Sequence, residues 1–191
     1  MTFDPRRYGP IFAPLLDVAQ LNSLRPGDEK SPKVRELQTL SLETAFAPRT
    51  IRDHDMAHGC RAGLWLLHDE LDESHRISQE IETATGSFWH AIMHRREPDY
   101  DNAKYWFRRV GQHPVFESLQ KSARELAAHA PADRADDFLR TQAAWDPFRF
   151  VDLCAAVAAG RSTSETLCRQ VQRREWELLF DYCFALAVDA A

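Results

Sequence analysis

Glycine is scarce in this sequence, with 7 residues in 191, and long runs of β-branched residues are nearly absent. Strands favour β-branched side chains, and the tight turns between strands favour glycine, so this composition predicts an all-α protein. The length is typical of one domain. We therefore expect a single-domain bundle of roughly seven to nine helices over residues 31–191, with residues 1–30 as an N-terminal arm packed on the core.

Several functional signatures are also missing. The sequence has no CxxC pair, no GxxxxGK or GxGxxG phosphate loop, and no GxSxG nucleophile motif. No apolar run reaches the roughly 18 residues of a membrane span, and the N-terminus lacks the apolar core of a signal peptide. The net charge of −5 disfavours a nucleic-acid partner. We therefore predict a cytoplasmic protein without nucleic-acid or membrane partners, whose four cysteines are buried, reduced thiols.

Helix boundaries can be read near the C-terminus. Residues 162–165, STSE, have the form of a capping box, in which Ser162 would cap the last helix and Glu165 would complete the box. Gly160 just before it is typical of a residue that ends the preceding helix, expected at residues 148–159. These signals predict two C-terminal helices joined by a short connection.

The segment Ser87–Pro114 resembles a single tetratricopeptide-type hairpin of two short antiparallel helices. Ala91, Ala103, Phe107 and Pro114 fall near the small, small, aromatic and proline positions of that pattern. The tryptophan of the first helix and the glycine beside the small residue are missing from their usual places. Because the match covers 28 of 191 residues and no second copy occurs, it implies a hairpin and not a peptide-binding array.

Histidines are concentrated in the middle of the chain. Six of the eight lie within residues 54–94. Residues three and four apart share one face of a helix, so a helical pair of this spacing can hold one metal ion. Imidazole and carboxylate ligands suit zinc, iron, manganese or nickel. A spacing of four and then three residues occurs twice, in His68, Asp72 and His75 and in His90, His94 and Glu97, and these six residues are the candidate metal ligands.

An HxxxH pair without the glutamate of HExxH is a weak motif, and both sets also fit polar helix faces without a ligand. The stretch LWLLHDELDESH, residues 64–75, resembles the metal-binding helix of HD-type phosphohydrolases, in which a His-Asp pair follows an apolar run. That resemblance implies an all-helical metal-dependent hydrolase with His68 and Asp69 as ligands. The separate upstream histidine and the distant aspartate of the HD pattern are not evident in this sequence.

The hairpin segment is basic within an acidic chain. Five cationic residues and three acidic residues give residues 87–114 a net charge of 5 − 3 = +2. Arginine binds carboxylate and phosphate groups with two parallel hydrogen bonds, so an anion site is one interpretation. The other is pairing within the chain, to the acidic segment at residues 69–82. The candidate anion-binding residues are Arg95, Arg96, Arg108 and Arg109.

Two classes of function therefore remain open. The first is a helical binding or scaffold protein with a His/Arg-rich pocket for an anionic small molecule or a protein partner. The second is a metal-dependent hydrolase acting on a phosphate or carboxylate ester, in which metal-bound water attacks and an arginine stabilises the developing anion. The sequence names no catalytic residue for either class.

Overall fold

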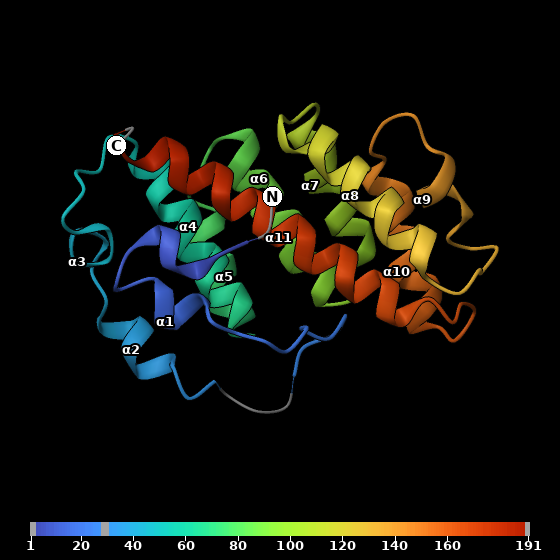
Figure 1. Cartoon of the computed structure of the whole chain (residues 1–191), viewed down its shortest axis with the longest axis horizontal. Coiled ribbons are helices and arrows are strands. Elements are labelled where there is room, and N and C mark those ends of the chain that lie inside the picture. The colour runs from blue at the N-terminus through green and yellow to red at the C-terminus, as the bar shows by residue number, and fades with distance from the viewer. Residues whose placement is uncertain (1–2, 28–30, 190–191) are drawn as a thin grey trace.

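The computed structural model describes residues 3–27 and 31–189, and within these ranges it contains helices and no strand. Eleven α-helices follow a short 3-10 helix (Figure 1). The expected seven to nine was too low, because four of the eleven are only four to six residues long and show no helical periodicity. The elements are η1 Pro5–Tyr8, α1 Ala13–Leu16, α2 Val34–Thr39, α3 Leu42–Phe46, α4 His54–Leu67, α5 Leu71–Ser78, α6 Ala84–Arg96, α7 Tyr100–Val110, α8 Val115–His129, α9 Asp137–Thr141, α10 Pro147–Ala158 and α11 Glu165–Ala187.

The long helix α11 holds the two ends of the bundle together. It crosses the molecule and packs on both α4 and α8 (Figure 1). Its Trp176 indole donates to the carbonyl oxygen of Gly63 on α4 at 2.8 Å. A side chain at Gly63 would lie 2.8 Å from the Trp89 ring, so the close approach of α4 and α6 needs glycine there. In the described part of the chain no helix, α11 included, is long and apolar enough to cross a membrane.

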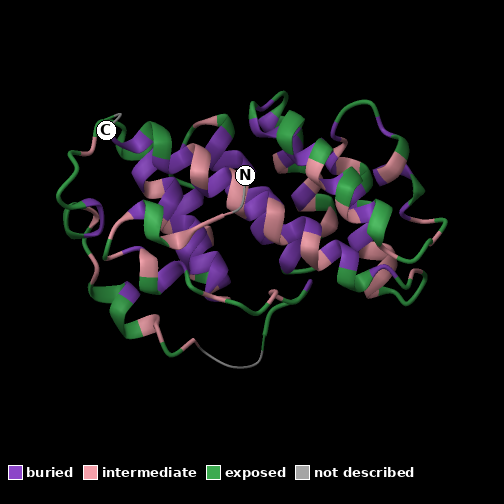
Figure 2. Ribbon diagram, in the orientation of Figure 1, coloured by how far each residue is buried: buried purple, intermediate pink, exposed green. Residues whose placement is uncertain are grey.

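Tryptophan and the other large side chains fill the interfaces between helices. Four of the five tryptophans, Trp65, Trp89, Trp145 and Trp176, are buried. Figure 2 shows that buried residues follow the sides of the helices that face one another. All four cysteines are buried and free, as the sequence predicts. The exception among the tryptophans is the half-buried Trp106, which lies against a histidine.

The N-terminal segment lies over α4 and α11. Tyr8 packs edge-on against Phe184, with ring centroids 5.0 Å apart. Further along, Arg169 and Arg173 of α11 donate to backbone carbonyl oxygens of this segment. The predicted boundary at residue 30 falls within residues 28–30, outside the described residues.

The start of α11 differs from a capping box. Its N-cap is Ser164, whose side chain makes no capping hydrogen bond. The Ser162 hydroxyl donates instead to Asp133 at 2.9 Å, and the Ser164 hydroxyl donates to Asp136 at 2.7 Å. The last helix was therefore expected at the right place, but it begins at Glu165, two residues later than a cap at Ser162 implies, and the serines tie it to the loop before α9. Gly160, with φ of 68°, ends α10 as expected.

Candidate metal centre

The candidate site lies where α5 meets the hairpin of α6 and α7. The Thr83 hydroxyl caps α6 by accepting from the amide of Gly86, and Asp99 caps α7 by accepting from the amide of Asn102. Residues 97–99 form the turn between the two helices, which pack closely. This hairpin brings the last turn of α6 and the first turns of α7 together beside α5.

Three histidines converge at this place. His75 comes from α5, while His90 and His94 are one turn apart on α6. Each offers a ring nitrogen, and these nitrogens all lie within 4.8 Å of one another. The ring centroids are 4.6 Å apart for His75 and His90, 5.3 Å for His75 and His94, and 4.7 Å for His90 and His94. The spacing in the sequence predicted the pair on α6, and the fold adds the third imidazole.

His90 is the most enclosed of the three. It is 2% exposed and stacks on the indole of Trp106, with centroids 4.0 Å apart. Burial, with the nearby His94 and His75, lowers the pKa of His90 to about 3, so the ring is neutral at pH 7. Its Nδ1 is buried and has no hydrogen-bond partner in the part of the chain that the structure describes. A buried polar nitrogen without a partner is costly, and a bound ligand would satisfy it.

His94 has polar neighbours on both sides of its ring. Its Nδ1 lies 3.2 Å from a carboxylate oxygen of Glu97, and its Nε2 lies 3.1 Å from the side-chain nitrogen of Asn102. A proton on Nδ1, shared with Glu97, leaves the lone pair on Nε2. Burial lowers the pKa of His94 and raises the pKa of Glu97. A carboxylate behind an imidazole is the arrangement that orients histidine ligands in many metal sites.

These residues have the chemistry of a metal site. Neutral imidazoles are the form that binds transition metals, and burial keeps both histidines of α6 in that form. In a tetrahedral zinc site with Zn–N bonds of about 2.0–2.1 Å, the ligand nitrogens lie about 3.3 Å apart. Nitrogens within 4.8 Å of one another would reach that spacing with movements below about 1 Å each. The amide of Asn102 would have to turn away from Nε2 of His94.

His68 does not join this cluster, although its spacing to Asp72 and His75 predicted one stripe. Asp69 has φ of 65° and breaks the helix, so His68 ends α4 while Asp72 and His75 belong to α5. Both ring nitrogens of His68 are occupied, Nδ1 by the hydroxyl of Ser31 at 2.8 Å and Nε2 by the carbonyl oxygen of Leu15 at 2.9 Å.

The HD-type resemblance depends on the same two residues. With His68 bonded on both sides and Asp69 engaged by Arg96 and by the amide of Gly27, neither is available as the HD pattern requires. Asp72 is exposed on α5, three residues before His75, and its negative charge contributes to the raised pKa of Glu97.

Two of the four candidate anion-binding arginines are engaged inside the protein. Arg95, 1% exposed, forms a two-bonded ion pair with the fully buried Glu175 of α11 and lies over the ring of Phe150. Arg96 donates to the carbonyl oxygen of Leu66 at 2.9 Å and pairs with Asp69. Pairing within the chain was the alternative interpretation of the sequence, and it describes both residues.

The other two arginines lie on α7 and are exposed. Arg109 packs over the indole of Trp106, 5.1 Å from the ring centroid. Trp106 in turn stacks on His90, so Arg109 lies near the histidine cluster, whereas Arg95 and Arg96 are engaged by Glu175 and Asp69.

Three residues of this region were missed from the sequence: Asp99, Asn102 and Trp106. Asn102 and Trp106 are four apart on α7, so they share the face that points toward α6. The hairpin, once assumed, could have identified them, because the helix after the turn must lie against the histidine-bearing face.

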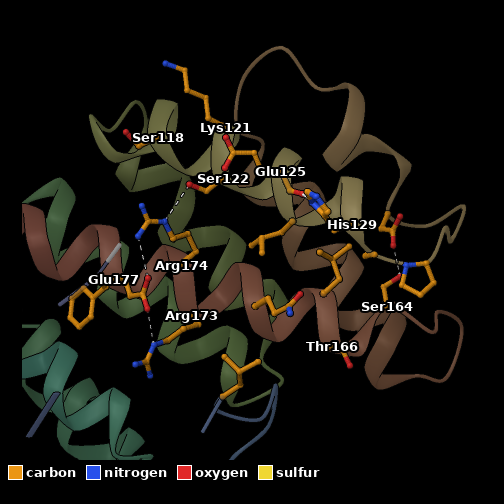
Figure 3. A pocket seen from close by; sticks show the side chains of 18 of the residues that line it. Ser118, Lys121, Ser122, Glu125, His129, Ser164, Thr166, Arg173, Arg174 and Glu177 are labelled. Atoms are coloured by element: carbon orange, nitrogen blue, oxygen red, sulfur yellow. Dashed lines mark hydrogen bonds and ion pairs between the residues drawn. The ribbon is translucent and has the colours of Figure 1, made fainter. Parts of the chain in front are cut away.

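A groove of about 1130 Å³ lies elsewhere, between α8 and α11 (Figure 3). Three of its charged side chains pair within the groove. Arg174 bonds to the Ser122 hydroxyl at 3.3 Å and to Glu177 at 3.2 Å, and Glu177 also accepts from Arg173 at 3.1 Å. The groove brings together no set of three metal-ligating side chains among the described residues, which distinguishes it from the histidine cluster.

Comparison with known proteins adds no family: no protein-family model, curated protein or solved structure matches this chain.

Proposed function

We propose that this protein binds one divalent transition-metal ion, zinc being the simplest case, through His75, His90 and His94. The observation that carries the proposal is the convergence of three ring nitrogens within 4.8 Å, one of them on a buried imidazole whose Nδ1 lacks a partner among the described residues. Zinc, iron, manganese and nickel all accept imidazole ligands. Zinc favours four-coordinate geometry, in which three imidazoles fill three of the four positions.

Glu97 and Trp106 support this arrangement from outside the three ligands. The carboxylate of Glu97 fixes the orientation of His94 through Nδ1. The indole of Trp106 covers His90 and keeps water from one side of the ring. Binding proteins for anions need free cationic groups, and Arg95 and Arg96 are already paired. Only the exposed Arg108 and Arg109 remain for an anion, and neither is buried as His90 is, so we favour a metal-binding function over the anionic ligand that the sequence also allowed.

Metal-dependent hydrolysis is the second candidate function. Three protein ligands leave a fourth position for water, as in catalytic zinc sites, whereas structural zinc sites are closed by four protein ligands. Zinc would lower the pKa of that water to about 7 and so supply a nucleophile.

The test is calorimetric titration of metal-free protein with zinc. We expect one site per chain, and we expect the half-buried His75→Ala variant to lose at least tenfold in affinity. His75 is chosen because His90→Ala would also open a cavity in the core. The matched control is His129→Ala, which removes an exposed histidine on α8 and should leave the affinity unchanged. Absence of stoichiometric binding, or equal losses in the two variants, would overturn the proposal.

A further inference from the structure

The mouth of the histidine cluster is lined by three carboxylates. Glu97 lies against His94, and the Asp99 carboxylate is 4.0 Å from Nδ1 of the same ring. Asp72, one turn before His75 on α5, is close enough for its charge to act on Glu97. All three residues are exposed whereas His90 and His94 are buried, so the carboxylates lie on the solvent side of the imidazoles. We refer to Asp72, Glu97 and Asp99 as the acidic rim.

The cations nearby only partly offset the acidic rim. Arg76, beside His75, pairs with Glu73 at 2.5 Å. Arg109 packs on Trp106 and contributes one positive charge to this side of the molecule. Lys104 of α7 pairs with Asp152 of α10. The three rim carboxylates and the guanidinium of Arg109 sum to 1 − 3 = −2, which would offset the +2 charge of a bound divalent ion.

Resting on the proposed metal site, we propose that the acidic rim makes its open coordination position selective for neutral ligands and substrates, because the rim weakens the binding of phosphate and carboxylate anions that the metal alone would attract. The acidic rim alone would not define a site. The buried Nδ1 of His90, without a partner in the described chain, independently indicates that a ligand belongs here. For the hydrolase candidate, the substrate class is then a neutral ester or amide, not a phosphate ester.

Coulomb's law gives the size of the effect. In water, one carboxylate about 8 Å from the bound anion lowers the affinity for a monoanion roughly twofold and the affinity for a dianion roughly fivefold. Two carboxylates together lower the affinity for a monoanion by about fivefold and the affinity for a dianion by about thirtyfold. A neutral ligand experiences none of this discrimination.

The experiment uses the cobalt(II) form of the full-length protein, whose visible spectrum reports a ligand entering the open position. Imidazole and phosphate are titrated separately at mildly alkaline pH, where phosphate is mainly a dianion. Asp72→Asn should raise the affinity for phosphate about fivefold, and the double variant Asp72→Asn/Asp99→Asn should raise it about thirtyfold. The affinity for imidazole should not change. Asparagine also caps helices, so the double variant keeps the start of α7.

Glu125→Gln is the matched control, since it removes an exposed carboxylate on α8, outside the acidic rim. It should leave both affinities unchanged. If cobalt binds but the rim variants leave phosphate affinity unaltered, or shift imidazole and phosphate equally, the inference is wrong while the metal site stands. If neither cobalt nor zinc binds, the metal site itself is wrong, and the inference falls with it.

Discussion

Replacing Glu175 by glutamine should lower the free energy of unfolding by about 3–5 kcal/mol, because Arg95 would keep its positive charge in the core without a negative partner. Arg95 is 1% exposed and Glu175 is fully buried, so solvent cannot compensate the charge. Glutamine preserves the shape and one acceptor oxygen, which isolates the loss of charge. In a domain of this size, such a loss corresponds to a fall in melting temperature of about 6–20 °C.

Urea unfolding followed by circular dichroism measures this change directly. The control is Asp152→Asn, which breaks the largely exposed pair with Lys104 and should cost at most about 1 kcal/mol. The double variant Arg95→Met/Glu175→Leu should recover most of the stability, since an apolar pair removes the uncompensated charge. A cost of Glu175→Gln as small as that of the control would refute the reasoning and return Arg95 to the candidate anion-binding residues.

Two further predictions concern the core. Burial lowers the pKa of His113 to about 4, and its Nδ1 accepts from the amide of Val115, so the neutral ring is the folded form. The unfolded chain therefore binds a proton at higher pH than the folded chain does. Because of this difference, the free energy of unfolding should fall between about pH 6.5 and 4 by up to about 1.4 kcal/mol per pH unit. A His113→Gln variant whose stability declines as steeply as that of the unmodified protein over this range would contradict the prediction. Gly63→Ala should destabilise the protein by about 1–3 kcal/mol, because the added methyl group meets the ring of Trp89. An unchanged free energy of unfolding in urea would contradict this and show that α4 and α6 can move apart.

The longer helices could be predicted from the sequence because local residues set their boundaries. Gly160 and Gly111 both adopt positive φ where helices end, and Pro98 lies just after the last turn of α6. The all-α class and the helical hairpin at the middle of the chain rest on such signals. The short helices α1, α2, α3 and α9 could not be predicted, because they are held by packing against the bundle and not by their own periodicity.

Only part of the candidate metal site could be predicted from the sequence. The pairing of His90 and His94 follows from their spacing on one helix. The choice of His75 over His68 depends on the helix break at Asp69, and no local signal in the sequence predicts the positive φ of that residue. The partners of Arg95 were equally hidden. Glu175 is 80 residues away in the chain, and only the tertiary packing of α11 brings it to α6.

X-ray absorption spectroscopy at the zinc edge of zinc-loaded protein tests the central claim most directly. The proposed site predicts three imidazole nitrogens at about 2.0–2.1 Å and one further light ligand, and it predicts the loss of one imidazole in the His75→Ala variant. A spectrum dominated by oxygen ligands, or one that His75→Ala leaves unchanged, would contradict the assignment of His75, His90 and His94 as the metal ligands.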